Sequence, residues 1–230
     1  MNWQYNHDDM NAFISEILTY LTTPPADLIY YIILAFTVAG ALQSAFNHWR
    51  ASEFPQAKRA FAGLGILLGA QIFMFAISGL GWQEIVEPRT ILPPLERAYI
   101  MFGIIWITWL YAFPEPNRGA DATATLLSLF VLFALGLSLL TWQKQIADPQ
   151  FATLSYNQTV DDMLWQIGSL VLTLIGMGLL FLRRPDGMGY GVVLLFLGFL
   201  GHVVHLLFPT EGSYSGIVRL AYMAAYPILL

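Results

Sequence analysis

The chain contains no cysteine, which excludes disulfides, thiolate metal sites, iron–sulfur clusters and a cysteine nucleophile. Charge is scarce as well: Asp, Glu, Lys and Arg make up 11% of the 230 residues, well below the share of roughly 25% in an ordinary soluble domain. The net charge of −5 at pH 7 leaves no basic surface for DNA or RNA. The sequence therefore predicts no nucleic-acid partner, and it has too few polar side chains to cover a soluble domain of this length.

The sequence is instead rich in long hydrophobic runs, and 57% of the residues are apolar. A membrane-spanning helix needs about 20 mostly apolar residues. Seven such runs, separated by turn-forming stretches, cover residues 27–47, 60–78, 95–113, 122–140, 164–182, 188–208 and 217–230. We predict an all-α polytopic membrane protein, a bundle of seven transmembrane helices whose surroundings are the lipid bilayer. The last run is too short to span a bilayer, so we expect the natural protein to continue beyond Leu230.

The N-terminal segment, residues 1–26, is predicted to lie outside this membrane domain of residues 27–230. Between residues 9 and 21 the apolar side chains recur at helical spacing and share one face: Phe13, Ile14, Ile17, Leu18 and Leu21. This pattern is typical of an amphipathic helix on a membrane surface. A lid packed on the extracytoplasmic end of the bundle fits the same pattern.

Orientation follows from the basic residues in short loops, which favour the cytoplasmic side. With the N-terminus outside, the inner loops carry six such residues: Arg50, Lys58, Arg59, Arg118, Arg183 and Arg184. The outer loops then carry three, namely Arg89, Arg97 and Lys144. We therefore expect an outside N-terminus and a cytoplasmic C-terminus.

Two histidines near the outer end of the sixth span are candidates for binding. His202 and His205 are three residues apart, so they share one helical face. Histidine binds metals and haem and titrates near neutrality, which leaves a haem or metal site, a pocket-lining or pH-sensing role, and simple packing as alternatives. A complete metal site is not predicted, because His7 and His48 are the only other histidines and His48 is expected at the opposite face of the membrane. Retinal is excluded, since the only lysines, Lys58 and Lys144, fall in loops.

Charged residues at two predicted span starts form a second candidate group. Glu96 and Arg97 follow Pro93 and Pro94, which are expected to precede the helix, and Glu96 would then favour the helix dipole. Arg97 and the distant Arg219 need partners, either in an ion-pair network between helices or in an anion-binding pocket. Trp106 forms an aromatic face with Trp109, suited to helix packing or to a ligand.

No catalytic motif is present, but two segments resemble a known family. They are LPPLERA at residues 92–98, and VRLA at 218–221 followed by AYP at 225–227. Both resemble the N-terminal seven-helix membrane modules of bacterial sensor histidine kinases. The resemblance implies a dimeric input domain in the bacterial cytoplasmic membrane, whose seventh helix leads into a cytoplasmic output domain.

The leading hypothesis is therefore a transmembrane sensor that recognises a small-molecule stimulus or a condition at its outer face. A transporter or channel subunit, or an intramembrane haem or metal protein, is the alternative. The residues expected at the binding site are Glu96, Arg97, Trp106, His202, His205 and Arg219.

Overall fold

The computed structural model describes residues 3–52, 54–151, 153–210 and 212–230, and every element in them is helical. The all-α class is thus confirmed for this part of the chain. Among the described residues, six helices are long and apolar enough to cross a membrane: α2 (Leu28–Ser52), α3 (Pro55–Trp82), α4 (Pro88–Ala112), α5 (Arg118–Ile146), α6 (Val160–Arg183) and α7 (Met188–Leu207).

The remaining helices are shorter or lie apart from the bundle. α8 (Gly216–Ala225) continues as a 3₁₀ turn, η3 (Tyr226–Leu229), and is shorter than a membrane span. Two further 3₁₀ turns, η1 (Pro149–Phe151) and η2 (Tyr156–Gln158), lie between α5 and α6. The seventh span and the orientation of the bundle stay predictions.

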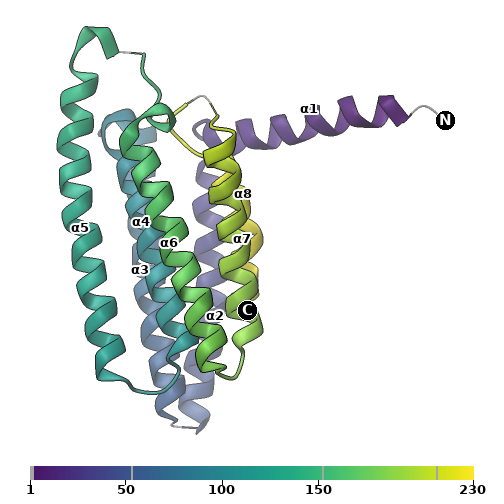
Figure 1. Ribbon diagram of the computed structural model, residues 1–230, viewed down its shortest axis with the longest axis vertical. Helices are drawn as coiled ribbons and strands as arrows, with labels where there is room; N and C mark the ends of the chain where they lie inside the picture. Colours follow the sequence, from purple (N-terminus) through teal and green to yellow (C-terminus); the bar gives the residue numbers. More distant parts are fainter. Residues whose placement is uncertain (1–2, 53, 152, 211) are drawn as a thin grey trace.

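The N-terminal helix α1 (Trp3–Thr22) is longer than the 9–21 segment expected from the sequence. It projects sideways from the bundle, away from the long helices (Figure 1). We call the end of the bundle where it attaches the α1 end; the α5–α6 connection and the start of α8 lie there too. The placement of α1 on a membrane surface stays a prediction.

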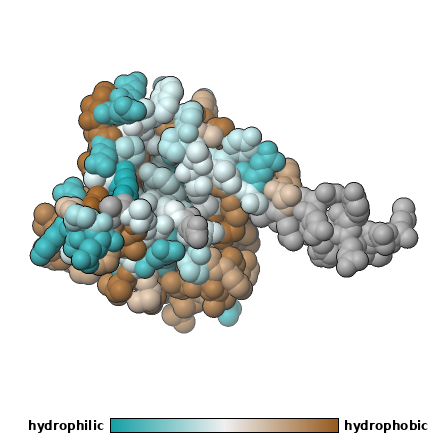
Figure 2. Space-filling model, turned by 90° about the horizontal axis from the view of Figure 1, so that it is seen from above, coloured by the Kyte–Doolittle hydropathy of each residue, from teal (hydrophilic) through white to brown (hydrophobic). Residues whose placement is uncertain are grey.

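Helix α4 occupies the centre of the bundle, where it packs against α3, α5, α6 and α7. The outer helices turn large apolar side chains outward, among them Leu126, Phe130 and Phe133 of α5, each more than half exposed. Viewed from the α1 end, hydrophilic surface gathers on the end face, with hydrophobic surface beside it (Figure 2). This distribution is what a helix bundle surrounded by lipid requires.

The start of α4 differs from the sequence prediction. The helix begins at Pro88, so Pro93 and Pro94 lie inside it rather than before it. Proline has no N–H, and the carbonyl of Arg89 therefore lacks the donor that residue 93 would normally supply. Nε1 of Trp142 donates to that carbonyl instead, at 2.7 Å. Because the helix starts earlier, Glu96 is not in its first turn, and the helix-dipole explanation for Glu96 is wrong.

Candidate functional site

Five of the six predicted site residues lie buried near the α1 end, each with at most 2% of its surface exposed: Glu96, Arg97, His202, His205 and Arg219. They come from three helices, α4, α7 and α8. Hydrogen bonds and ion pairs join them to further polar residues in two networks. The two networks meet at Glu96 and Arg97, which are neighbours in α4.

The first network, the Arg219 network, ties α8 to three other parts of the chain. Nε and Nη2 of Arg219 donate to Oε1 and Oε2 of Glu96 at 2.7 and 2.5 Å, the bidentate geometry that makes an arginine–carboxylate pair strong. Nη2 also donates to the hydroxyl of Tyr31 in α2 at 3.1 Å. Nη1 donates to the carbonyl of Leu21 in the last turn of α1. One guanidinium therefore links α1, α2, α4 and α8.

Asp27, just before α2, completes the Arg219 network. One of its carboxylate oxygens lies 3.9 Å from Nη1 of Arg219, and the side chain is 2% exposed. Burial raises the pKa of Asp27, although the neighbouring Arg219 acts in the opposite direction. Tyr214, whose ring lies 4.5 Å from the guanidinium carbon of Arg219, also has its pKa raised by burial.

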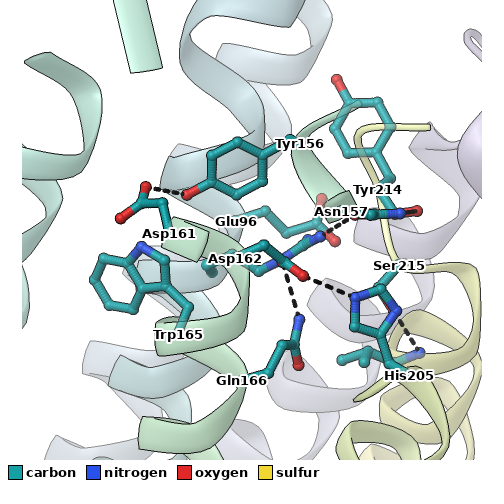
Figure 3. A network of polar contacts seen from close by, with 12 residues as sticks. Glu96, Tyr156, Asn157, Asp161, Asp162, Trp165, Gln166, His205, Tyr214 and Ser215 are labelled. Atoms are coloured by element: carbon teal, nitrogen blue, oxygen red, sulfur yellow. Dashed lines mark hydrogen bonds and ion pairs between the residues drawn. The ribbon is translucent and has the colours of Figure 1, made fainter. Parts of the chain in front are cut away.

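The second network, the Asp162 network, joins α4, α6, α7 and η2. Nε of Arg97 donates to Oδ1 of Asp162 at 2.6 Å, and Nη2 donates to the side-chain oxygen of Asn157 at 2.6 Å. Gln166 donates to the same Oδ1 at 3.2 Å. The other oxygen, Oδ2, lies 2.9 Å from Nε2 of His205 (Figure 3). The partner expected for Arg97 is thus an aspartate 65 residues away.

His205 also contacts the residue at which α8 begins. Its Nδ1 lies 2.8 Å from Oγ of Ser215, and that oxygen accepts from the backbone N–H of Val218 as the N-cap of α8. Asp162, His205 and Ser215 thus follow the hydrogen-bond order of a serine-hydrolase triad. Ser215 is 1% exposed and serves as a helix cap, so its hydroxyl holds α8 in position and is not presented to a substrate.

His202 has different partners. Its Nδ1 lies 2.5 Å from the side-chain oxygen of Gln166, and its Nε2 lies 3.2 Å from the hydroxyl of Tyr222 in α8. All four ring nitrogens of the two histidines are therefore engaged within the protein. A metal or haem at these rings would have to displace those hydrogen bonds. Among the described residues, no group of three potential ligands from His, Cys, Asp and Glu is found.

Trp106 is the predicted site residue that the structure does not bring to either network. Its Nε1 donates to Oγ of Ser128 in α5 at 3.1 Å, and its ring packs edge-on against Trp109. The hydrogen bond joins α4 to α5, and the ring contact lies within α4. Of the two roles weighed for Trp106, helix packing is the one that these contacts support.

A cleft at the α1 end reaches the Asp162 network. Its volume is about 260 Å³, and Asp162 and His205 line it together with Asn157, Thr159 and Pro209. A small cluster beside it, in which the Tyr156 hydroxyl bonds to Asp161 at 2.7 Å, connects η2 to α6. The sequence identified neither the cleft nor Asp162 as part of the site.

The sequence of α6 contains a pattern that could have identified Asp162 as part of the site. Asp162, Gln166, Ser169 and Thr173 recur at helical spacing along an otherwise apolar span, and each is at most 2% exposed. Such a polar stripe in a hydrophobic helix indicates a face turned toward other helices. The contributions of Tyr31, Asn157 and Ser215 carried no comparable signal, because each depends on which helices become neighbours.

Comparisons of the chain with known protein families, with curated proteins and with solved structures gave no match. What the chain does must therefore be read from its two polar networks and the helices they join.

Proposed function

We propose that the chain is the membrane input module of a bacterial signal-transduction histidine kinase, in which a stimulus at the α1 end moves α8. The observation that carries the proposal is the anchoring of α8, a helix of ten residues, by the buried pair between Arg219 and Glu96. A stimulus that binds one arrangement of this contact better than another shifts the population between them. In this proposal the α1 end faces outward and α8 passes the shift toward the cytoplasm.

The two segments that resemble sensor kinase modules support the proposal, because the bidentate pair joins them. Glu96 belongs to the first segment and Arg219 to the second, although 123 residues separate them in the sequence. A signal received near α4 and the loops of the α1 end would therefore have a direct route to α8 through this pair.

A transport function has less support. Gln71, an amide within the α3 span, is completely buried, donates to the backbone carbonyl of Tyr31 at 3.0 Å and accepts from the hydroxyl of Tyr99. It thus joins α2, α3 and α4 rather than lining a path. Interhelical hydrogen bonds of this kind are an ordinary packing device in membranes.

The test is phosphate transfer by the natural gene product in membranes of its own host. We expect incubation with radiolabelled ATP to place acid-labile phosphate on this polypeptide or on a protein that copurifies with it. Glu96→Gln should change the basal labelling rate about tenfold or more, since a broken buried pair costs several kcal/mol and 1.4 kcal/mol is about tenfold in an equilibrium constant.

The matched control is Lys144→Gln, which removes an exposed charge near the same end of the bundle and should leave the rate unchanged. Absence of acid-labile phosphate from both the polypeptide and its copurifying proteins would overturn the proposal. Equal labelling of Glu96→Gln and the unchanged protein would show that the Arg219 network does not control the rate of phosphorylation.

A further inference from the structure

His202 and His205 share one face of α7, yet the charges around the two rings differ. The partners of His202 are an amide oxygen and a phenol, both neutral. His205 instead faces the carboxylate of Asp162 at 2.9 Å. An adjacent carboxylate stabilises the charged form of an imidazole, whereas neutral partners give no such Coulombic support. Of the two, His205 is therefore the one built to hold a proton.

His205 is also the histidine that a proton can reach. It lines the cleft of about 260 Å³ at the α1 end, together with its carboxylate partner Asp162. A water molecule that enters this cleft would lie beside Asp162 and His205, so a proton would not have to cross the bundle. His202 does not line this cleft and sits between Gln166 and Tyr222.

Other charged groups near His205 are held in pairs. From α4, Arg97 binds the second oxygen of Asp162 at 2.6 Å, and Glu96 is paired with Arg219 of α8. Tyr214 in the loop before α8 lies against Arg219, and the other titratable group nearby on α7 is His202. The positive charge of Arg97 disfavours a second positive charge beside Asp162. The attraction that favours a positive charge on His205 therefore comes from Asp162.

We propose that His205 is a proton-binding site through which acidity at the α1 end controls the start of α8. With neutral His205, Nε2–H donates to Asp162, and Nδ1 accepts from the hydroxyl of Ser215. A proton taken from water onto Nδ1 turns that nitrogen into a donor. The Ser215 oxygen must then accept from Nδ1, and its own hydrogen must turn to another acceptor. Because the same oxygen caps α8 through Val218, one proton changes the cap of this helix.

This inference rests on the proposed input function, which it deepens by naming the stimulus as external acidity. Its parts can nevertheless be measured on the chain alone, with no output domain. Failure of the phosphorylation assay would therefore leave the proton site standing, and failure of the titration would leave the kinase proposal standing.

The experiment uses the chain in lipid nanodiscs and has two readouts. Nitrogen NMR of labelled histidine rings follows protonation. Because the chain has no cysteine, spin labels can be attached to a double variant, Leu164→Cys with Leu220→Cys, at exposed positions of α6 and α8. We expect the nitrogen signals of the His205 ring and the label-to-label distance to change with pH at the same midpoint.

Three variants separate the steps. His205→Gln should abolish the pH-dependent distance change, and the matched control His202→Gln should keep it. Ser215→Ala should keep the titration of His205 but lose the distance change. A His205 ring that does not titrate in the unmodified chain would overturn the proposal without reliance on any variant's folding. A distance change that persists in both His205→Gln and Ser215→Ala would overturn it as well.

Discussion

The side chains of Glu96 and Arg219 are both 0% exposed. The carboxylate and the guanidinium have therefore each lost their contact with water and gained each other as partner. Desolvation of two ions costs several kcal/mol, and the mutual attraction offsets that cost only while both ions and their hydrogen bonds are in place. At the scale of single residues, the pair of Glu96 and Arg219 is therefore stable as a whole and fragile to the loss of either partner.

Removal of one partner should cost more than removal of both. We expect Arg219→Met or Glu96→Leu alone to lower the free energy of unfolding by about 3–5 kcal/mol, because each leaves a buried, uncompensated charge. The double variant should cost less than either single change, since no charge then remains unpaired at this pair. Denaturant unfolding in mixed micelles measures all three, and additive costs would contradict this explanation.

Asp27 gives a prediction with a defined pH dependence. Burial raises its pKa in the folded state, so the folded protein binds a proton here more readily than the unfolded chain does. Stability from this group is therefore lost as the pH rises above the ordinary carboxyl range near about 4. We expect Asp27→Asn to be slightly more stable than the unchanged protein at pH 7, with the difference vanishing in acid.

Thermal unfolding of both proteins at several pH values tests this prediction. The substitution isolates the effect of the charge, because Asn keeps the shape of Asp and one hydrogen-bond acceptor. A variant that is less stable at pH 7 would mean that attraction to Arg219, 3.9 Å away, outweighs the cost of burial.

At the scale of elements, the internal prolines of α4 show how a helix defect is repaired by a neighbour. Pro93 leaves the Arg89 carbonyl without its helical donor, and Trp142 of α5 supplies one. The same bond fixes α5 against the first turns of α4, near the α1 end. A membrane helix tolerates proline where another helix satisfies the freed carbonyl.

Trp142→Phe keeps the ring but removes the donor. We expect a cost of about 0.5–1.5 kcal/mol in unfolding free energy, the net contribution of one hydrogen bond, here to a part-buried carbonyl. Trp82→Phe is the matched control, because Trp82 is 56% exposed and its loss should cost little. Equal stability of the two variants would show that the Arg89 carbonyl does not depend on Trp142.

Hydrophobic runs predicted the six long helices well, because burial in lipid needs only length and apolar composition. Their ends were less predictable: α4 starts at Pro88, seven residues before the expected 95, because Pro93 and Pro94, which normally precede a helix, lie inside this one. The sequence predicted that Arg97 and Arg219 have partners, because an unpaired charge at membrane depth is costly. The identity of those partners could not be predicted, because Asp162 meets Arg97 only when α6 packs on α4.

At the scale of the whole molecule, the orientation of the bundle decides which solution reaches the cleft. The absence of native cysteine makes the orientation directly testable. Gln83→Cys lies on an exposed loop at the α1 end, and Glu115→Cys on an exposed loop at the opposite end.

We expect a membrane-impermeant maleimide to label Gln83→Cys in intact cells, and Glu115→Cys only after the cells are opened. The reason is the excess of basic residues at the opposite end, which favours the cytoplasm. The reverse pattern would place the cleft and His205 on the cytoplasmic side.

The sequence separation within the networks has a consequence for how the protein is made. Glu96 and Arg97 leave the ribosome with α4, whereas Asp162 follows 65 residues after Arg97 and Arg219 follows 123 residues after Glu96. During synthesis α4 therefore carries a carboxylate and a guanidinium whose final partners do not yet exist. The final depth of α4 in the bilayer must wait for α6 and then α8, so a helix translated long after α4 completes its insertion.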